Sequence, residues 1–286
     1  MTSKDWIAGF LQAERLPEDF RALIERVHVP LAARIAARAM AKGSLLVVGL
    51  CGTQASGKST LVASVAALLR TAGLQVALLS IDDLYLGHAE RQQLARTVHP
   101  LLATRGVPGT HDVGLGMQVF DALLAGREVE LPAFDKAQDD RKPAGRGPRV
   151  AAGVQVLLFE GWCVGARPQA EAALVEPVNT LEREEDPDGR WRRFANAHLA
   201  GEYQQLFARL DELVLLKAPS FESVLAWRQL QEQKLRDRLL AAGESLARAM
   251  SDAQVARFIA HYERLTRHIL AEMPARADIV IPVERV

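Results

Sequence analysis

Residues 52–60 read GTQASGKST and match the pattern G-x-x-x-x-G-K-[ST]. In loops of this pattern the backbone N–H groups surround nucleotide phosphates, the lysine reaches the β- and γ-phosphates, and the last hydroxyl binds Mg²⁺. Lys58 would take the first of these side-chain roles and Ser59 the second. The pattern therefore predicts a nucleoside triphosphate site made of the following residues: Gly52, Thr53, Gln54, Ala55, Ser56, Gly57, Lys58, Ser59 and Thr60.

The segments on either side of this loop predict a strand before it and a helix after it. Residues 45–51 form a continuous apolar run, as expected for a strand buried in a parallel sheet. After the loop, Leu61, Val65 and Leu68 recur at helical spacing, and Gly73 stands where a helix commonly ends. The order strand, loop, helix directs the positive end of a helix dipole at phosphate.

Short apolar runs at five places predict the strands of one sheet. These runs cover residues 45–51, 75–81, 154–159, 212–217 and 278–283. Helical stretches lie between them, which is typical of repeated β-α-β units and of a parallel sheet with helices on both faces. The expected fold class is α/β, a three-layer αβα P-loop NTPase domain with a mainly parallel sheet.

The whole chain, residues 1–286, is expected to form a single domain with three additions. Residues 1–43 read as an N-terminal helical extension that Pro17 and Pro30 interrupt. Residues 88–153 are too many for a loop and are expected to bind the acceptor substrate, with a helix near 115–125. Residues 220–272 are expected to form a helical lid and C-terminal region that includes an amphipathic helix.

Composition excludes several other classes of protein. Apolar residues make up 49% of the chain and charged residues 24%, and the formal net charge is zero. This balance argues against nucleic acid or an anionic membrane as the main partner. We find no signal peptide and no apolar run long enough to span a membrane, and Cys51 and Cys163 do not suggest a disulfide framework. A soluble, cytoplasmic protein is expected, and its oligomeric state stays open.

Two acidic segments lie where parallel strands are expected to end. Asp82 and Asp83 follow the second strand in LLSIDDLYL, and Glu160 ends the apolar run VQVLLFEGW. Ligands in open α/β sheets bind at this edge. A carboxylate there can accept the proton of an attacking hydroxyl or bind Mg²⁺, which are the needs of phosphoryl transfer. Asp82 is the stronger candidate, and one of the two aspartates is expected to cap the next helix.

Polar residues in the segment 88–153 predict contacts with a small polar acceptor. Cations there would bind an anionic group and carboxylates would bind hydroxyls, although charged runs are often only solvated surface. With two residues of the LLSIDDLYL segment, the predicted acceptor-binding residues are Asp83, Tyr85, Arg105, His111, Asp112, Asp135, Lys136 and Arg141.

Arg228 permits two interpretations. An arginine closing over the phosphates can stabilise charge in the transition state, and Arg228 would then bind the nucleotide. Arg228 and Glu232 are also spaced four residues apart, which is a common spacing for a solvated ion pair on a helix.

Taken together, several strings resemble the D-glycerate 3-kinase family, within the uridine kinase, phosphoribulokinase and pantothenate kinase group of P-loop kinases. The strings are GTQASGKSTL, LSIDDLYL, RG-x-PGTHD, PAFDKAQDDR and LFEGWCVG. The resemblance spans nearly the whole chain. It implies ATP and Mg²⁺ as cofactors, Lys58 on the β/γ end of the triphosphate and Asp82 as general base. It also implies Ser59 and Glu160 at Mg²⁺, with Asp82 as a further candidate.

The resemblance implies transfer of the γ-phosphoryl group of ATP to a hydroxyl of D-glycerate or a similar small, anionic hydroxy acid. Family members often have Tyr before Asp-Lys-Ser, where this chain has Phe134-Asp135-Lys136-Ala137, so the acceptor can differ. One alternative is a kinase of the same group that acts on a nucleoside, a pantothenate-like alcohol or a sugar. A second is a nucleotide-hydrolysing switch or assembly factor, although the guanine signature N-K-x-D does not occur. A third is a degenerate nucleotide binder.

Overall fold

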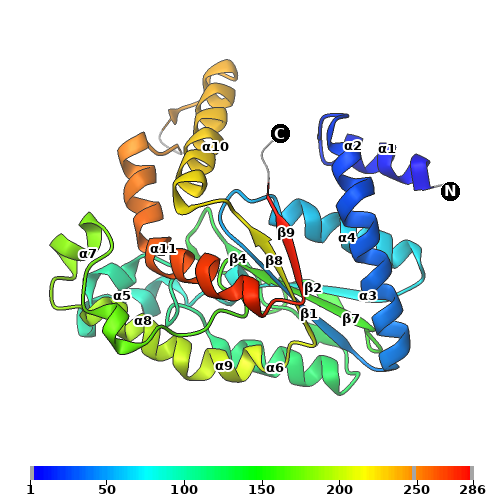
Figure 1. Ribbon diagram of the computed structural model, residues 1–286, viewed down its shortest axis with the longest axis horizontal. Helices are drawn as coiled ribbons and strands as arrows, with labels where there is room; N and C mark the ends of the chain where they lie inside the picture. Colours follow the sequence, from blue (N-terminus) through cyan, green and yellow to red (C-terminus); the bar gives the residue numbers. More distant parts are fainter. Residues whose placement is uncertain (1–2, 247–248, 284–286) are drawn as a thin grey trace.

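A five-stranded parallel sheet forms the centre of the computed structural model (Figure 1). The structure describes residues 3–246 and 249–283. The strands lie in the order β2 (Val76–Ser80), β7 (Val156–Gly161), β1 (Leu46–Gly52), β8 (Glu212–Lys217) and β9 (Ile279–Pro282). All four neighbouring pairs are parallel. All five predicted strands are confirmed, and the strand before the P-loop lies in the middle of the sheet.

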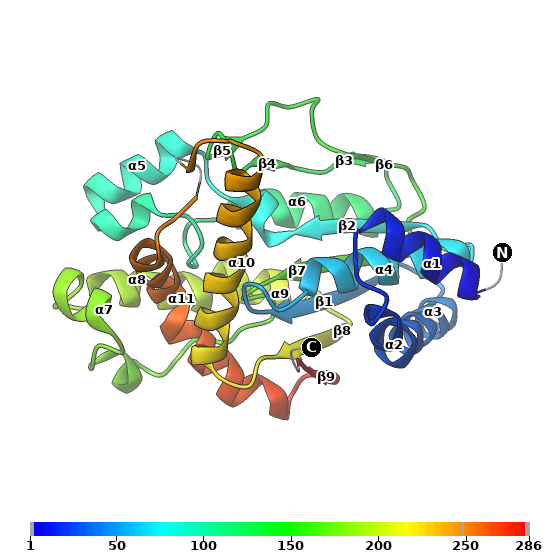
Figure 2. The same ribbon diagram turned by 90° about the horizontal axis from the view of Figure 1, so that it is seen from above.

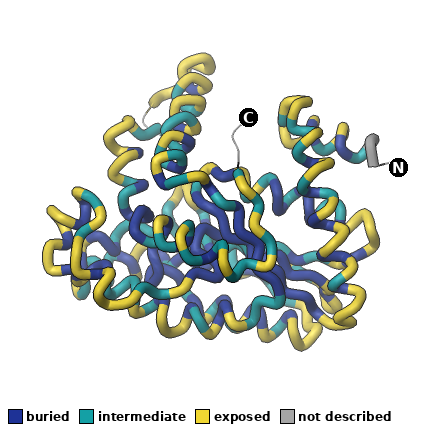
Figure 3. The backbone as a smooth tube through the Cα atoms, viewed as in Figure 1, coloured by how far each residue is buried: buried dark blue, intermediate teal, exposed yellow. Residues whose placement is uncertain are grey.

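Helices cover both faces of the sheet, which confirms the three-layer architecture (Figures 1 and 3). Side chains of a strand point alternately to opposite faces. In β1, Val47 and Cys51 belong to one hydrophobic core, and Val48 and Leu50 belong to the other. One face is covered by α3 (Val29–Lys42) and α4 (Lys58–Thr71). The other is covered by α6 (Val113–Leu124), α8 (Arg190–Ala200), α9 (Glu202–Phe207) and the end of α11 (Asp252–Glu272).

The N-terminal extension packs on the helix that follows the P-loop. It contains α1 (Ser3–Ala13), α2 (Phe20–Leu23), the π-helical turn Ile24–His28, and α3. The prediction that Pro30 interrupts the helices is wrong, because Pro30 lies in a helical run that continues to Lys42. The wider π-turn just before it makes room for the proline ring, which would otherwise meet the carbonyl one turn earlier. His28 Nδ1 lies 2.5 Å from Ser64 Oγ of α4.

Most of the segment 88–153 lies beyond the β2 edge of the sheet, as Figure 2 shows, while its helix α6 packs on one face of the sheet. It has its own helices and two short antiparallel strand pairs rather than one long loop. Its elements are α5 (His88–Thr97), the 3-10 turn Pro100–Ala103, α6, β3 (Val129–Glu130), β4 (Phe134–Asp135), β5 (Asp140–Arg141) and β6 (Arg149–Val150). The helix predicted near 115–125 is α6.

The C-terminal helices stand over the carboxyl ends of the strands. They are α10 (Phe221–Ala241), which projects away from the sheet, and α11, which packs against it (Figure 1). The short helix α7 (Thr180–Glu185) contacts α11. Further 3-10 turns cover Ile81–Leu84, Glu171–Leu174 and Met273–Ala275. Within the described residues, none of the helices combines the length and the apolar character needed to cross a membrane.

Candidate active site

The predicted phosphate loop connects β1 to α4 in a conformation that its sequence makes possible. Gly57, directly before α4, has φ +83°, a left-handed value that favours glycine. Ala55 also has a positive φ, of 58°, which is uncommon for a residue with a Cβ and typical of functional loops. A Cβ on Gly52 would lie 2.9 Å from Ser56 Oγ, so this position accepts only glycine without a shift.

This loop forms one wall of a cleft of about 680 Å³. All nine residues from Gly52 to Thr60 line the cleft. The other lining residues come from six separate segments: Asp82, Tyr85, Arg105, Lys136, Glu160, Trp162, Trp227, Arg228, Gln231, Lys234, Phe258 and Tyr262. The cleft therefore joins the predicted nucleotide site to part of the predicted acceptor site.

The polar atoms of the loop fit a bound triphosphate with its metal ion. Among the described residues, the buried oxygens Thr53 Oγ1, Gln54 Oε1 and Ser56 Oγ have no hydrogen-bond partner. Glu160 Oε2 lies 2.5 Å from Lys58 Nζ, although the geometry does not make a hydrogen bond. Mg²⁺ in such enzymes binds one or two side-chain oxygens plus substrate phosphates. The Ser59 hydroxyl and the Glu160 carboxylate, both at the cleft, are a suitable pair.

Asp82 lies just beyond the carboxyl end of β2, as predicted, in the 3-10 turn Ile81–Leu84. The hydroxyl of Tyr85 donates to its Oδ1 at 2.8 Å, and Lys136 Nζ donates to its Oδ2 at 2.7 Å. Burial by itself raises the pKa of Asp82, but the charge of Lys136 and these two hydrogen bonds outweigh it and lower the pKa overall. Asp82 is therefore an ionised carboxylate that faces the phosphate loop.

Asp83 does not line the cleft, and neither aspartate caps a helix. Ser80 Oγ accepts from the Asp82 N–H and so caps the 3-10 turn. Asp83 instead accepts a hydrogen bond from the Phe134 N–H at 3.2 Å and thereby ties β4 to the 3-10 turn that follows β2. Burial raises the pKa of Asp83. Asp83 is therefore placed to support the predicted acceptor wall, the side of the cleft that carries Tyr85, Arg105 and Lys136, rather than to bind a ligand directly.

Of the eight residues predicted to bind the acceptor, three lie in the cleft, namely Tyr85, Arg105 and Lys136. The other five do not line it, and each has a partner within the fold. They are Asp83, His111, Asp112, Asp135 and Arg141.

These partners hold the acceptor wall together. Arg141 Nε donates to the Tyr85 carbonyl at 2.7 Å, and its Nη2 donates to Asp112, which caps α6. His111 stacks on the Tyr85 ring, and its Nδ1 lies 2.6 Å from Tyr203 Oη. Burial lowers the pKa of His111 to about 4, so it is neutral at pH 7. Asp135 accepts from the backbone of the turn that follows it.

Arg105 is a fixed cation of the cleft. It forms an ion pair with Asp139, and its guanidinium lies 5.4 Å from the centre of the Phe134 ring and 6.0 Å from that of Tyr85. The hydroxyl of Tyr262 donates to the Arg105 carbonyl at 3.0 Å. A Cβ on the next residue, Gly106, would lie 2.1 Å from that hydroxyl oxygen. This close approach requires glycine.

Helices α10 and α11 supply cleft residues that were not predicted from the sequence. Arg228 lines the cleft and also pairs with Glu232 at 2.8 Å, but this pair is not a solvated one, because the two side chains are only 17% and 2% exposed. The missed residues on these helices are Trp227, Gln231, Lys234, Phe258 and Tyr262, and Trp162, directly after β7, is a further one. Residues 227, 231 and 234 are spaced so that they share one face of a helix. This spacing, together with the positive charge of Lys234, could have indicated from the sequence that the face lines the cleft.

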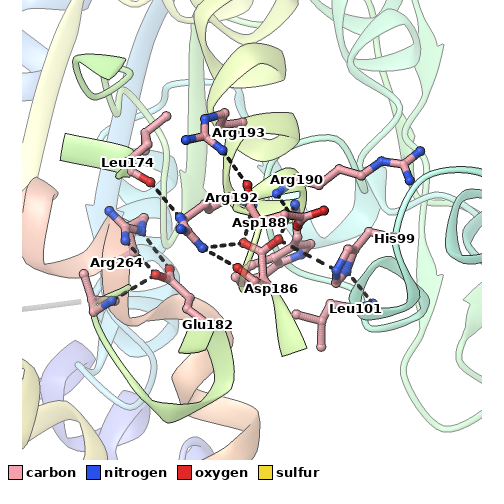
Figure 4. A network of polar contacts seen from close by, with 12 residues as sticks. His99, Leu101, Leu174, Glu182, Asp186, Asp188, Arg190, Arg192, Arg193 and Arg264 are labelled. Carbon is pink, nitrogen blue, oxygen red and sulfur yellow. Dashed lines mark hydrogen bonds and ion pairs between the residues drawn. The ribbon is translucent and has the colours of Figure 1, made fainter. Parts of the chain in front are cut away.

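A network of buried ion pairs fixes the helices behind this wall (Figure 4). Arg264 of α11 donates to both carboxylate oxygens of Glu182 of α7, at 2.7 and 2.6 Å. Arg192 of α8 pairs with Asp186, and His99 Nε2 lies 3.7 Å from the same carboxylate. Because α11 also carries Tyr262, these contacts fix the position of the residue that holds Arg105.

The family model of the methylmalonyl-CoA mutase-associated GTPase MeaB matches residues 22–85. These residues run from α2 through the P-loop to Asp82 and Tyr85. The match omits Glu160, the segment 88–153 and the lid helices, so it is confined to the nucleotide-binding part of the chain.

Other comparisons extend over most of the chain. It is 33% identical over 234 residues to the uncharacterized kinase mug58 of Schizosaccharomyces pombe, which covers 77% of this chain and 79% of that protein. It is 30% identical over 248 residues to the chloroplastic D-glycerate 3-kinase of Arabidopsis thaliana, covering 82% of this chain and 50% of that protein.

The fold is similar to that of a solved D-glycerate 3-kinase from Cryptococcus neoformans var. grubii. The TM-score is 0.73 at 24% identity, and the likeness covers 93% of this chain and 97% of that one. Sequence and fold thus agree along most of the chain, beyond the P-loop itself. The chain belongs to the P-loop kinases of the D-glycerate 3-kinase group.

Proposed function

We propose that this kinase transfers the γ-phosphoryl group of ATP to a hydroxyl of D-glycerate or a similar small hydroxy acid. The observation that carries the proposal is the meeting of one carboxylate and two cations opposite the P-loop, namely Asp82, Arg105 and Lys136. A carboxylate suits a hydroxyl that must lose its proton, and cations suit an acceptor that bears a carboxylate. The relative named D-glycerate 3-kinase supports the same acceptor.

In the proposed mechanism the P-loop backbone binds the triphosphate and Lys58 lies on its β/γ end. Ser59 and Glu160 would hold Mg²⁺, which would supply neutralisation of the phosphate charge. One carboxylate oxygen of Asp82 accepts the proton of the acceptor hydroxyl, while Tyr85 donates a hydrogen bond to the other carboxylate oxygen of Asp82. Arg105 binds the acceptor carboxylate, and Arg228 contributes positive charge near the phosphates. Phosphoryl transfer depends mainly on such positioning and electrostatic stabilisation.

The proposal assigns a role to each addition to the single domain. Residues 88–153 form the acceptor wall, because they supply Arg105 and Lys136. Residues 220–272 form the lid, because α10 and α11 supply Trp227, Arg228, Lys234 and Tyr262. Residues 1–43 act as a packing cap on α4, through the contact of His28 with Ser64.

The test is ADP release with ATP and Mg²⁺ against a panel of small hydroxy acids, sugars and nucleosides. We expect D-glycerate to stimulate release, and we expect Asp82→Asn to abolish the stimulation. Phosphorus NMR of the product would then identify the phosphorylated hydroxyl. Stimulation by a nucleoside, a sugar or a pantothenate-like alcohol alone would assign another acceptor within the same group. Release that no acceptor stimulates would favour a nucleotide-hydrolysing switch.

A further inference from the structure

The Asp82 carboxylate makes a hydrogen bond at each of its oxygens, and the two donors differ in character. Tyr85, which donates to Oδ1, is buried and packed between His111 and Phe134. Lys136, which donates to Oδ2, has a side chain that is 62% exposed, whereas that of Asp82 is 28% exposed. Ion pairs with so exposed a partner are weak, because water screens the charges. An anionic ligand in the cleft can therefore compete for the lysine.

The backbone that carries Lys136 is fixed at both ends of its hairpin. The Phe134 N–H donates to Asp83, and Asp140 Oδ1 accepts from the His88 N–H at 3.1 Å. Arg91, which is 1% exposed, donates to the Asp139 carbonyl at 2.7 Å and pairs with its carboxylate at 2.8 Å. A change of partner at Lys136 thus requires only its flexible side chain to move, with the hairpin in place.

Arg105 differs from Lys136 in this respect. Its guanidinium is paired with Asp139 and lies against the Phe134 and Tyr85 rings. A planar guanidinium held at several points keeps its position, whereas an ammonium on a four-carbon chain changes partner readily. The cleft therefore combines a fixed cation with an exchangeable one, and the exchangeable one is bound to the base.

We propose that Lys136 blocks Asp82 until an anionic acceptor draws the ammonium group away, and that this exchange selects hydroxy acids over neutral alcohols and water. The inference rests on the proposed function, because it takes Asp82 as the base. After the exchange, Asp82 Oδ2 accepts the proton of the acceptor hydroxyl. The hydroxyl oxygen bonds to the γ-phosphorus as the bond from that phosphorus to the ADP oxygen breaks.

A neutral acceptor cannot bring about this exchange. Glycerol and water carry a hydroxyl but no negative charge, so they do not compete for Lys136, and Asp82 stays paired with it for most of the time. The same arrangement limits hydrolysis of ATP when no acceptor is bound. Lys136 acts here as a specificity-determining residue, and its contribution to binding the acceptor is separate from its effect on the base.

The test compares Lys136→Met with the native chain in three assays of ADP release, with no acceptor, with glycerol and with D-glycerate. We expect the rates without acceptor and with glycerol to rise about fivefold, because the block is only as strong as the exposed ion pair between Lys136 and Asp82. We expect kcat/KM for D-glycerate to fall about tenfold, because a charged hydrogen bond to the acceptor is lost. The preference for D-glycerate over glycerol then falls by about fiftyfold.

Two further variants separate the block from other effects. Lys142→Met changes an exposed lysine that follows the same hairpin and does not line the cleft, and it should match the native chain in all three assays. Lys136→Met combined with Asp82→Asn should lose the rise in acceptor-free hydrolysis, because the rise acts through Asp82. A rise that persists in the double variant contradicts the inference.

The outcomes distinguish this inference from the proposed function. If Lys136 only binds the acceptor, Lys136→Met lowers the D-glycerate rate and leaves the other two rates at the native level, which overturns the inference. If the native chain does not phosphorylate D-glycerate, the proposed acceptor is wrong. The acceptor-free assay still decides the block in that case, because it needs no acceptor, and a rate that does not rise refutes it.

Discussion

The two halves of the cleft are built in different ways. The phosphate half is a run of nine consecutive residues from the last residue of β1 to the first turn of α4, held by backbone conformation at positions such as Gly57. The acceptor half is assembled from side chains of separate segments, with Asp82, Arg105 and Lys136 far apart in the chain. A local loop can serve every kinase of a group, whereas an assembled wall can change one side chain at a time. Differences in acceptor are therefore expected to arise in the second half.

The largest expected effect comes from the residue that joins the two halves. Asp82→Asn should lower kcat about 10²–10⁴-fold, because it removes the proposed general base while keeping the shape of the side chain. The affinity for ATP should stay nearly unchanged, since the phosphate half is intact. Steady-state kinetics together with calorimetric titration of ATP would check this. A loss of ATP affinity as large as the loss of rate would move Asp82 from the acceptor half to the nucleotide site.

A somewhat smaller effect is expected from the phosphate half itself. Lys58→Met should lower kcat by about 10²–10³-fold for every acceptor, because it removes a positive charge from the β/γ end of the triphosphate. Ratios of kcat/KM between acceptors should stay as in the native chain. Measuring those ratios with two hydroxy acids sharpens the comparison, and a changed ratio would show that the halves are not independent.

A change in the proposed acceptor half should affect KM for one class of acceptor instead of kcat for every acceptor. Arg105→Met should raise KM for carboxylate acceptors by about 10- to 100-fold, because a hydrogen bond between charged groups is lost. KM for ATP should stay within about twofold of the native value. Arg146→Met is a matched control, since Arg146 is an exposed arginine of the same segment that does not line the cleft. Equal effects of the two substitutions would remove Arg105 from the acceptor site.

The smallest effect on activity is expected at His28, which contacts Ser64 of α4, the helix that follows the P-loop. Burial lowers the pKa of His28 to about 4, so the unfolded chain binds this proton more readily than the folded chain. The contribution to stability is complete above pH 6.5, the ordinary pKa, and is lost as the pH falls towards 4, by about 3 kcal/mol in all. His28→Gln should remove this part of the pH dependence of urea unfolding and leave activity at pH 7 unchanged.

The native chain, unfolded in urea over the same pH range, provides the reference for this measurement. An unchanged pH dependence in His28→Gln would mean that this buried histidine does not limit stability in acid.

The sequence by itself determined those parts of the protein whose structure depends on residues close together in the chain. The strand, loop and helix around residues 45–71 follow from an apolar run, a glycine pattern and a helical repeat, so the fold and the phosphate site could be predicted. The five strands could be predicted for the same reason. The π-turn before Pro30 could not, because a proline normally interrupts a helix and only packing reveals the exception.

What only the tertiary structure decided is which polar residues face the cleft. Arg105 and Arg141 look alike in the sequence, yet Arg105 lines the cleft while Arg141 ties Tyr85 to Asp112. Lys234 and Tyr262 enter the cleft because α10 and α11 stand over the strand ends. The physical reason is that a loop motif depends on local backbone geometry, whereas an assembled wall depends on how distant helices and hairpins pack, which no local pattern specifies.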